Sequence, residues 1–370
     1  MRTVRAALVV VAVSIAGAMV AAPAVGQGTQ PGTITEFPTP ANSTPVGIVQ
    51  GPDGAMWIAG IDADRVFRMT TDGQITDTFP SSGDALSQPN FITVGPDGNL
   101  WLTEDDDNDT GGNAIVRLTP AGVSTVFPLP TNQSLAQYIV PGPDGRLWFT
   151  EAGPTVNKIG SIDPSAPNPG ATIQEYNLTG ALPFGITVGP DGLIWFTEQS
   201  TNAIGHLDPM AANVQASLVE IPLPAGQQSP TGIVTGPDGQ LWFTLQGSAR
   251  IGTITTAGAV GGFDLPQPGP SEPTGITAGP DGALWYTLSE ATSAAIGRIT
   301  TTGEITSAAL PVPASDPFVI NTGPAATLWF TEIALGGNGD RVGRISDILQ
   351  PNPPPASVPV PVVVQPTFTG

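Results

Sequence analysis

One motif occurs seven times along the chain, and this repetition restricts the fold more than any other feature of the sequence. Gly-Pro-Asp-Gly-x-x-Trp begins at residues 51, 95, 142, 189, 236 and 279, and a degenerate copy ends at Trp329. These copies contain all seven tryptophans of the 370-residue chain, 43 to 47 residues apart. A period of about 40–50 residues made of short strands is typical of the blades of a β-propeller.

Each repeat has the pattern of four short strands. In the fourth copy, apolar or β-branched segments occupy residues 185–188, 193–197, 203–207 and 217–221. The motif residues 189–192 form a tight turn between the first two strands, because proline presets φ and glycine supplies a residue with positive φ. Four antiparallel strands joined by turns make one propeller blade.

The outermost strand of each blade predicts how the ring closes. Its pattern appears once before the first blade, at residues 34–37, and does not recur after the seventh tryptophan. Seven complete blades therefore require residues 34–37 to pair with the last blade, which leaves no open edge between first and last blades. We predict an all-β, seven-bladed β-propeller with four-stranded blades over residues 33–348, its ring closed by the N-terminal strand.

The two ends of the chain differ from the repeats. Residues 1–26 have a basic start, an apolar stretch and small residues, so we predict a secretory signal peptide cleaved within residues 22–28. The apolar stretch is shorter than the ~20 residues that a membrane span needs. We expect a secreted, extracytoplasmic protein with no membrane insertion after cleavage. Residues 349–370 are rich in proline, which predicts a disordered tail.

Composition excludes several kinds of chemistry and several partners. The chain has no cysteine, so it forms no disulfide or thiolate metal site, and its single histidine excludes a two-histidine site. Its net charge of -20 disfavours nucleic acid and anionic lipid as partners. Dinucleotide-binding and P-loop motifs are absent, so we expect no organic cofactor. We expect a monomer that binds a small molecule or peptide.

The blade motif resembles that of a known family. Most blades read Pro-x-Gly-Ile-x-x-Gly-Pro-Asp-Gly-x-Leu-Trp-Phe-Thr-Glu, followed by Ile-Gly-Arg-Ile-Thr and Gly-x-Ile-Thr. This pattern resembles the virginiamycin B lyase (streptogramin lyase) family over nearly the whole mature chain. The resemblance implies a seven-bladed propeller and an enzyme that opens the ester of a cyclic depsipeptide antibiotic by elimination, with magnesium and histidine.

The resemblance also implies four functional positions, and this sequence keeps one of them. The family's Glu-Pro-His falls on Glu272, Pro273 and Thr274, so the carboxylate remains and threonine replaces histidine. The second histidine position is Thr231, and the second carboxylate position is Leu288. We therefore assign no catalytic residue.

His206 does not supply the missing group. It lies in a third-strand column that is otherwise mostly arginine, serine and threonine. We expect a solvated surface residue, since a third strand is well away from the central channel and a general base must approach its proton within roughly 3 Å.

Strand geometry predicts where a ligand can bind. The start of each first strand and the end of each second strand lie on the same face, opposite the Gly-Pro-Asp-Gly turns. Residues that precede the first strands are candidate ligand contacts: Asn90, Gln137, Phe184, Thr231, Thr274 and Phe318. Carboxylates at the same mouth are candidate metal ligands: Glu272, Glu104, Glu151, Glu198 and Glu332. Oxygen ligands suit Mg²⁺ or Ca²⁺, and the alternative is a ring of solvated surface carboxylates.

Two other repeated columns have a structural interpretation. The motif aspartates are predicted to be turn residues, because aspartate bonds to nearby backbone, and the tryptophans are predicted to pack between blades. The aspartates are Asp53, Asp97, Asp144, Asp191, Asp238 and Asp281.

Two functions remain open. The first is an exported scaffold that binds a ligand or partner, with a divalent cation at the acidic channel mouth. The alternative is a metal-dependent carbon-oxygen lyase, or a lactone hydrolase, that opens the ester of a cyclic depsipeptide such as streptogramin B. Metal-bound water can act as a nucleophile without histidine, because the metal lowers the pKa of that water.

Overall fold

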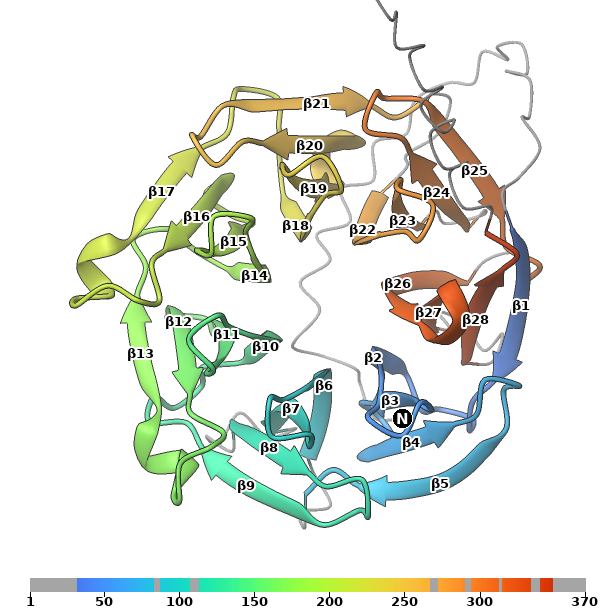
Figure 1. Ribbon diagram of the computed structural model, residues 1–370, viewed down its shortest axis with the longest axis horizontal. Helices are drawn as coiled ribbons and strands as arrows, with labels where there is room; N and C mark the ends of the chain where they lie inside the picture. The colour runs from blue at the N-terminus through green and yellow to red at the C-terminus, as the bar shows by residue number, and fades with distance from the viewer. Residues whose placement is uncertain are drawn as a thin grey trace, which may run out of the picture.

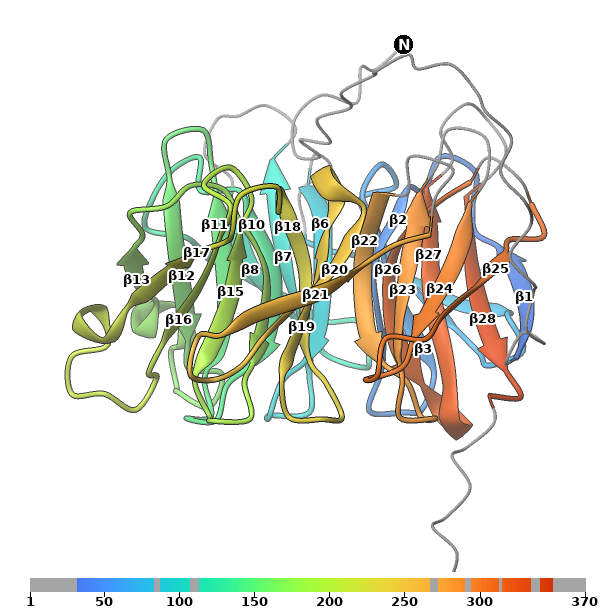
Figure 2. The ribbon, with the colours of Figure 1, turned by 90° about the horizontal axis from the view of Figure 1, so that it is seen from above.

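Seven four-stranded antiparallel sheets surround a central axis in the computed structural model (Figure 1), which confirms the predicted seven-bladed propeller. Seen from the side, the sheets stand around the axis with the innermost strands nearly parallel to it (Figure 2). The structure describes residues 32–82, 87–106, 113–266, 272–289, 294–312, 315–333 and 340–348. The predicted signal peptide and proline-rich tail lie outside these residues. Within them, no helix is long and apolar enough to cross a membrane.

The blades are numbered by the order of their innermost strands, and each is given from the innermost strand outward. Blade 1 contains β2 (Pro45–Gln50), β3 (Met56–Gly60), β4 (Arg65–Met69) and β5 (Ile75–Pro80). Blade 2 contains β6 (Ser87–Val94), β7 (Leu100–Asp106), β8 (Ala114–Leu118) and β9 (Ser124–Pro128). Blade 3 contains β10 (Ala136–Pro141), β11 (Leu147–Ala152), β12 (Asn157–Ile162) and β13 (Gln174–Asn177). Blade 4 contains β14 (Pro183–Val188), β15 (Ile194–Glu198), β16 (Ala203–Leu207) and β17 (Val219–Pro222).

The remaining blades follow the same order. Blade 5 contains β18 (Pro230–Thr235), β19 (Leu241–Leu245), β20 (Arg250–Ile254) and β21 (Val260–Asp264). Blade 6 contains β22 (Glu272–Ala278), β23 (Leu284–Ser289), β24 (Ala295–Ile299) and β25 (Ile305–Ala309). Blade 7 contains β26 (Asp316–Gly323), β27 (Thr327–Ile333), β28 (Arg341–Ser346) and β1 (Thr33–Pro38). Short 3₁₀ helices are η1 (Pro169–Thr172), η2 (Gln215–Ser217), η3 (Gln246–Ser248) and η4 (Pro324–Ala326).

The N-terminal strand closes the ring, as the strand count predicts. β1 pairs antiparallel with β28, with Ile34 opposite Ile345, and the two ends of the described chain lie side by side (Figure 1). The buried carboxylate of Asp340 fixes the link from β1 to blade 1. Its Oδ2 atom accepts hydrogen bonds from the backbone N–H groups of Ser43 at 2.6 Å and Thr44 at 3.0 Å. This capped loop delivers the chain from the outside of blade 7 to the inside of blade 1.

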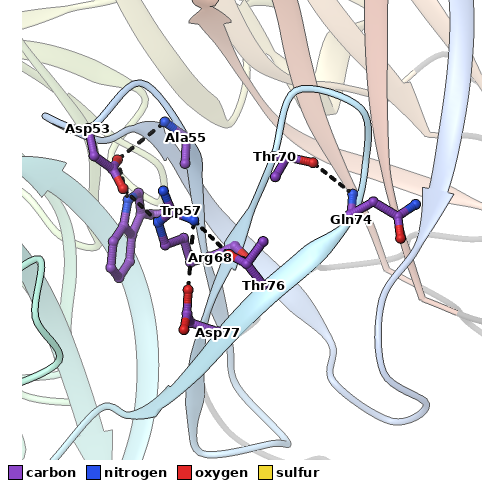
Figure 3. Close-up of polar contacts among 8 residues, drawn as sticks. All are labelled: Asp53, Ala55, Trp57, Arg68, Thr70, Gln74, Thr76 and Asp77. Carbon is purple, nitrogen blue, oxygen red and sulfur yellow. Dashed lines mark hydrogen bonds and ion pairs between the residues drawn. The ribbon is translucent and has the colours of Figure 1, made fainter.

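The motif aspartate joins a turn to a core tryptophan. In blade 1, Asp53 Oδ1 accepts hydrogen bonds from the Ala55 N–H at 3.2 Å and from Trp57 Nε1 at 3.0 Å, while Arg68 Nε donates to Oδ2 at 2.6 Å (Figure 3). Gly54 has φ of 79°, a conformation that glycine adopts at no steric cost. The predicted role of the aspartate as a turn residue is confirmed, and the turn also satisfies the indole N–H.

The tryptophans are buried in the core, as predicted. Trp57 packs with Ile92 and Leu100 of blade 2, so it contributes to the interface between two blades. It also stacks on Phe79 of the outer strand of its own blade, with ring centroids 5.5 Å apart. Stacking of this kind adds to the stabilisation from area burial.

A β-bulge interrupts the pairing of the first and second strands in every blade. In blade 5, Pro230 pairs with Leu245 and Ile233 with Phe243, so two residues lie opposite Thr244. The Thr244 hydroxyl accepts a hydrogen bond from the N–H of Gly232 at 2.9 Å and donates one to the carbonyl of Thr274 in blade 6 at 2.7 Å. It therefore joins the bulge of one blade to the bulge of the next.

This threonine contact recurs around the ring. Among the described residues, the hydroxyl donates to the carbonyl of the next blade in five interfaces, over 2.7–3.0 Å. The pairs are Thr150–Phe184, Thr197–Thr231, Thr244–Thr274, Thr287–Phe318 and Thr331–Val46. All five threonines are fully buried.

We predict that Thr244→Val lowers the free energy of unfolding by about 1–3 kcal/mol, because it leaves a buried N–H and a buried carbonyl without a partner. Urea denaturation followed by circular dichroism measures the change. Thr244→Ser keeps the hydroxyl and is the matched control. We expect its free energy of unfolding to fall clearly less than that of Thr244→Val. Equal losses in both variants would contradict the prediction, because the hydroxyl would then contribute no more to stability than the methyl group that serine lacks.

A second prediction concerns the buried hydroxyl of Tyr286, which has no hydrogen-bond partner among the described residues. Phe149, Phe196, Phe243 and Phe330 occupy the equivalent position in other blades. We expect Tyr286→Phe to raise the free energy of unfolding by about 1–2 kcal/mol, since it removes an unsatisfied buried group. Urea denaturation would contradict this if the variant is less stable than the parent chain.

Candidate functional site

Four aromatic side chains from four blades meet at the centre of the propeller. Phe91 lies on β6, Tyr138 on β10, Phe184 on β14 and Phe318 on β26, among the innermost strands that surround the axis (Figure 1). The Phe91 centroid is 3.8 Å from that of Tyr138, 6.0 Å from Phe184 and 6.2 Å from Phe318. The centroids of Phe184 and Phe318, from blades 4 and 7, are 6.4 Å apart. We call these four residues the channel cluster.

The channel cluster lies near the end of the channel predicted to bind ligand. Pro183, next to Phe184, pairs with Glu198 at the end of the second strand, so the start of β14 and the end of β15 share one level. Phe184 and Phe318 are predicted ligand contacts, and the structure brings them together. Phe91 and Tyr138 were missed by the sequence reasoning. They replace the glycine of Pro-x-Gly, and that departure from the repeat is the signal that could have found them.

The other predicted ligand contacts are polar and buried. Asn90 is 1% exposed, and its side-chain nitrogen has no hydrogen-bond partner among the described residues. The Gln137 side-chain nitrogen donates to the Leu135 carbonyl at 3.3 Å. Asn90 and Gln137 directly precede Phe91 and Tyr138 of the channel cluster.

Blades 5 and 6 present small residues where blades 2, 3, 4 and 7 present rings. Their bulges contain Thr231 with Gly232 and Thr274 with Gly275. The two threonine hydroxyls donate to carbonyls two residues earlier in the chain, those of Ser229 and Glu272, at 3.3 and 3.4 Å. The channel lining is therefore aromatic on one side and small and polar on the other.

Two polar pairs join neighbouring blades close to these threonines. Gln246 Nε2 donates to Glu272 Oε2 at 3.2 Å, linking blades 5 and 6. Ser289 Oγ donates to Asp316 Oδ1 at 2.6 Å, linking blades 6 and 7. Glu272, which is a predicted metal ligand, is partly buried and is the first residue of β22, where it pairs with Ser289 of β23.

The strand-end glutamates are buried but are not gathered in one place. Glu104, Glu151, Glu198 and Glu332 are 0–3% exposed, which contradicts the alternative of a solvated carboxylate ring. Strand alternation explains their positions. Thr150 points to the next blade, so its neighbour Glu151 points the opposite way, over Gly160 of the third strand.

No group of three or more histidine, cysteine or acidic side chains in the described part of the chain is placed to hold a metal. The structure does not test whether a cation binds at the channel mouth. That role for Glu272 and the four strand-end glutamates therefore stays a prediction.

Burial changes the acidity of three of these glutamates. It raises the pKa of Glu151 to about 8, with the Glu175 carboxylate acting in the same direction and Lys158 and Ser134 opposing it. Burial likewise raises the pKa of Glu198 to about 8, and the Glu220 carboxylate contributes. Glu332 has its pKa raised to about 7, mainly by burial. The outer-strand glutamates were not recognised as partners from the sequence.

His206 differs from the expected solvated residue. It lies on β16 of blade 4 and is half-buried, with its ring centroid 4.4 Å from that of Trp195. Burial lowers the pKa of the imidazole. Packing against the core tryptophan of its own blade accounts for its position.

The residues at the family's functional positions do not fit its magnesium-and-histidine chemistry. Glu272 is present and partnered by Gln246, whereas Thr231 and Thr274 are buried hydroxyl residues and Leu288 is a buried apolar one. These residues supply one carboxylate and no imidazole. The aromatic and hydroxyl lining can contact a ligand, but neither histidine position holds an imidazole.

Glu151 makes stability depend on pH. Its folded pKa of about 8 lies above the ordinary 4.5, so the folded protein retains a proton that the unfolded chain loses. The contribution of Glu151 to the free energy of unfolding is fully present below pH 4.5. It declines as the pH rises to about 8, by at most about 1.4 kcal/mol per pH unit. We predict that Glu151→Gln unfolds at a higher urea concentration than the parent at pH 8, with a smaller difference at pH 5.

The matched control is Glu304→Gln, which removes an exposed carboxylate from the connection between β24 and β25. We expect it to follow the pH profile of the parent chain. Equal pH profiles for Glu151→Gln and the parent would mean that Glu151 is ionised in the folded protein.

Comparisons with known proteins agree with the fold. Among curated proteins no sequence matches the chain. A solved streptogramin B lyase structure is 32% identical, with a TM-score of 0.71, and covers 85% of this chain and 97% of its own. Selenomethionine-substituted virginiamycin B lyase from Staphylococcus aureus is 31% identical, with the same TM-score, covering 85% and 98%.

A third similar structure is a catalytically inactive histidine-to-alanine variant of the Staphylococcus aureus enzyme with quinupristin. It is 29% identical, with a TM-score of 0.71, over 85% of this chain and 98% of that one. The sequence model of the virginiamycin B lyase family matches residues 18–166 and 87–350. With its seven blades and the repeated Trp-Phe-Thr-Glu strand, this chain belongs to the virginiamycin B lyase family.

Proposed function

We propose that this protein is an exported scaffold that binds a small molecule or a peptide loop at the channel mouth. The channel cluster carries the proposal. Four rings from separate blades meet at the axis, beside Asn90, whose buried amide nitrogen has no partner among the described residues. Binding sites commonly combine apolar and aromatic walls with a few polar groups that orient the ligand.

The lining indicates the chemistry of the ligand. An aromatic or apolar group would pack against Phe91 and Phe184, because ring pairs attract at centroid separations of about 4.5–7 Å. Hydrogen-bonding groups would face Thr231 and Thr274 on the opposite side. The nearby carboxylates of Glu272 and Asp316, together with the net charge of -20, favour a neutral or cationic ligand over an anionic one.

The alternative is a metal-dependent carbon-oxygen lyase, or a lactone hydrolase, that opens the ester of a cyclic depsipeptide. Identity of 32% to a streptogramin B lyase favours it. Against it, both histidine positions hold threonine, and the similar histidine-to-alanine variant is catalytically inactive. A divalent cation at the mouth, Mg²⁺ or Ca²⁺, remains part of either proposal, with Glu272 as the best-placed carboxylate.

The cellular context belongs to the same proposal. The leader composition of residues 1–26 supports export, and the acidity of the chain supports the absence of nucleic-acid binding. We propose that the mature protein acts as a monomer outside the cytoplasmic membrane.

Quinupristin is the first probe, because the similar Staphylococcus aureus structure was solved with it. We predict saturable binding by isothermal titration calorimetry, at least tenfold weaker in Phe91→Leu, which keeps an apolar side chain but removes the ring. Val123→Ala, at an exposed position before the outer strand of blade 2, is the control and should bind like the parent chain. Unchanged affinity in Phe91→Leu would move the binding site away from the cluster.

Mass spectrometry of the same mixtures with Mg²⁺ tests the alternative. Accumulation of linear quinupristin, abolished by Glu272→Ala, would establish the lyase and overturn the binding proposal. Intact quinupristin after prolonged incubation, together with saturable binding, supports a binding scaffold.

A further inference from the structure

The buried faces of blades 3 and 7 contain the same charged arrangement. In blade 3, Glu151 pairs across the sheet with Lys158, and Glu175 of the outer strand lies opposite Gly160, two residues beyond the lysine. In blade 7, Glu332 pairs with Arg341, and Glu36 lies opposite Gly343. Each of these blades therefore places one cationic side chain between an inner and an outer glutamate.

Lys158 shows what the cationic group does in this arrangement. Its Nζ atom is 2.6 Å from Glu175 Oε2 and donates to the Thr131 hydroxyl over the same distance. Thr131 belongs to the segment that enters the blade, and its backbone N–H donates to Glu175 Oε1 at 3.0 Å. The ammonium thus joins a glutamate and a threonine hydroxyl at the edge of the blade.

Blade 4 repeats this arrangement without the cation. Glu198 pairs with Ala203, and Glu220 lies opposite Gly205. Thr179 matches Thr131, because its backbone N–H donates to Glu220 Oε1 at 2.8 Å and its hydroxyl donates to Oε2. Alanine stands where the other two blades have lysine or arginine.

The carboxyl group of Glu198 points toward Glu220, where the cationic side chain lies in blades 3 and 7. It lies within hydrogen-bonding reach of Glu220. It also lies beneath Gly180, where an added Cβ would approach Glu198 Oε2 to 1.9 Å. Glu198 is 1% exposed, and its Oε1 atom has no hydrogen-bond partner among the described residues. A buried carboxylate oxygen without a partner is costly, so the site lacks one positively charged or donating group.

We propose that blade 4 binds a hard divalent cation, Ca²⁺ in the first instance, between Glu198 and Glu220 at the position that Lys158 Nζ occupies in blade 3. The available donors are all oxygens, from the two carboxyl groups and from the hydroxyls of Thr179 and Thr201. Thr201 already donates to Glu198 Oε2 at 3.1 Å. Oxygen-only donor sets that include carboxylates suit Ca²⁺. Thr179 and Thr201 are exposed, which gives the ion and its water ligands a route in.

This site is separate from the channel cluster and goes beyond the proposed function. Glu198 points along its own blade toward the outer strand β17, whereas Phe184 of the same blade points into the channel. Loss of the cation site should therefore leave quinupristin binding unchanged, so the two proposals fail independently.

The experiment is a Ca²⁺ titration of the full mature chain, using CaCl₂ alone as the probe. We expect a binding isotherm that includes one ion at blade 4, still present in Glu272→Ala, and a higher melting temperature at about 10 mM CaCl₂, since extracellular calcium modules bind at roughly 0.1–1 mM. Glu198→Gln removes a ligand charge and should abolish both signals. Ala203→Lys supplies the ammonium from the protein, so it should be more stable without Ca²⁺ and unresponsive to it.

Two control variants should keep the response of the parent chain. Glu304→Gln removes an exposed carboxylate from the connection between β24 and β25. Ala295→Lys places a lysine at the register equivalent to Ala203 in blade 6, where the inner partner is Leu288. Absence of a Ca²⁺ signal in the parent chain, or a full Ca²⁺ response in Ala203→Lys, would overturn the proposal.

Discussion

The buried threonine near the end of the second strand, present in every blade except blade 1, is the contact on which the central part of this propeller depends. Thr197, for example, holds the bulge of its own blade through the N–H of Gly185 and reaches the carbonyl of Thr231 in the next blade. An ideal Cβ on Gly185 would approach that same carbonyl to 2.4 Å, so the innermost strands are in close backbone contact. Because backbone atoms set the spacing of the blades, the residue before this glycine can vary without disturbing the ring.

That freedom gives the channel its asymmetry. Seven identical blades would present the same side chain to the axis seven times. Here blades 2, 3, 4 and 7 contribute rings, whereas blades 5 and 6 contribute Thr231 and Thr274 with glycine beside them. A bulge re-aims side chains at the edge of a sheet, which is why such distortions are frequent next to functional sites. The fold is therefore uniform, and the chemistry at its centre comes from departures from the repeat.

The sequence predicts the blade number, the closing strand and the role of the motif aspartates, because repeats and turns depend on local residues. It also places Phe184 and Phe318 at the channel, since strand pairing fixes their level. Phe91 and Tyr138 lie in the next column, at the glycine position of the repeat, and the bulge turns this second residue toward the axis. For the strand-end glutamates, the sequence gives the position along the channel axis but not the direction of the side chain. Alternation along the strand buries Glu151 over Gly160.

The same column shows how the fold accommodates charge at a blade interface. Blades 5 and 6 avoid the problem with Leu245 and Leu288, which are buried apolar residues. Blades 3 and 7 keep a glutamate and place a lysine or arginine at the neighbouring register position. Both solutions are physically sound, because a buried carboxyl group is tolerated when it is paired and is costly when it is not. Blades 2 and 4 follow neither, because Glu104 pairs with Ala114 and Glu198 pairs with Ala203. Blade 4 differs from blade 2 in its outer strand, which has Glu220 where blade 2 has Val126. An external cation that completes the contact between two carboxyl groups is the simplest physical explanation for blade 4.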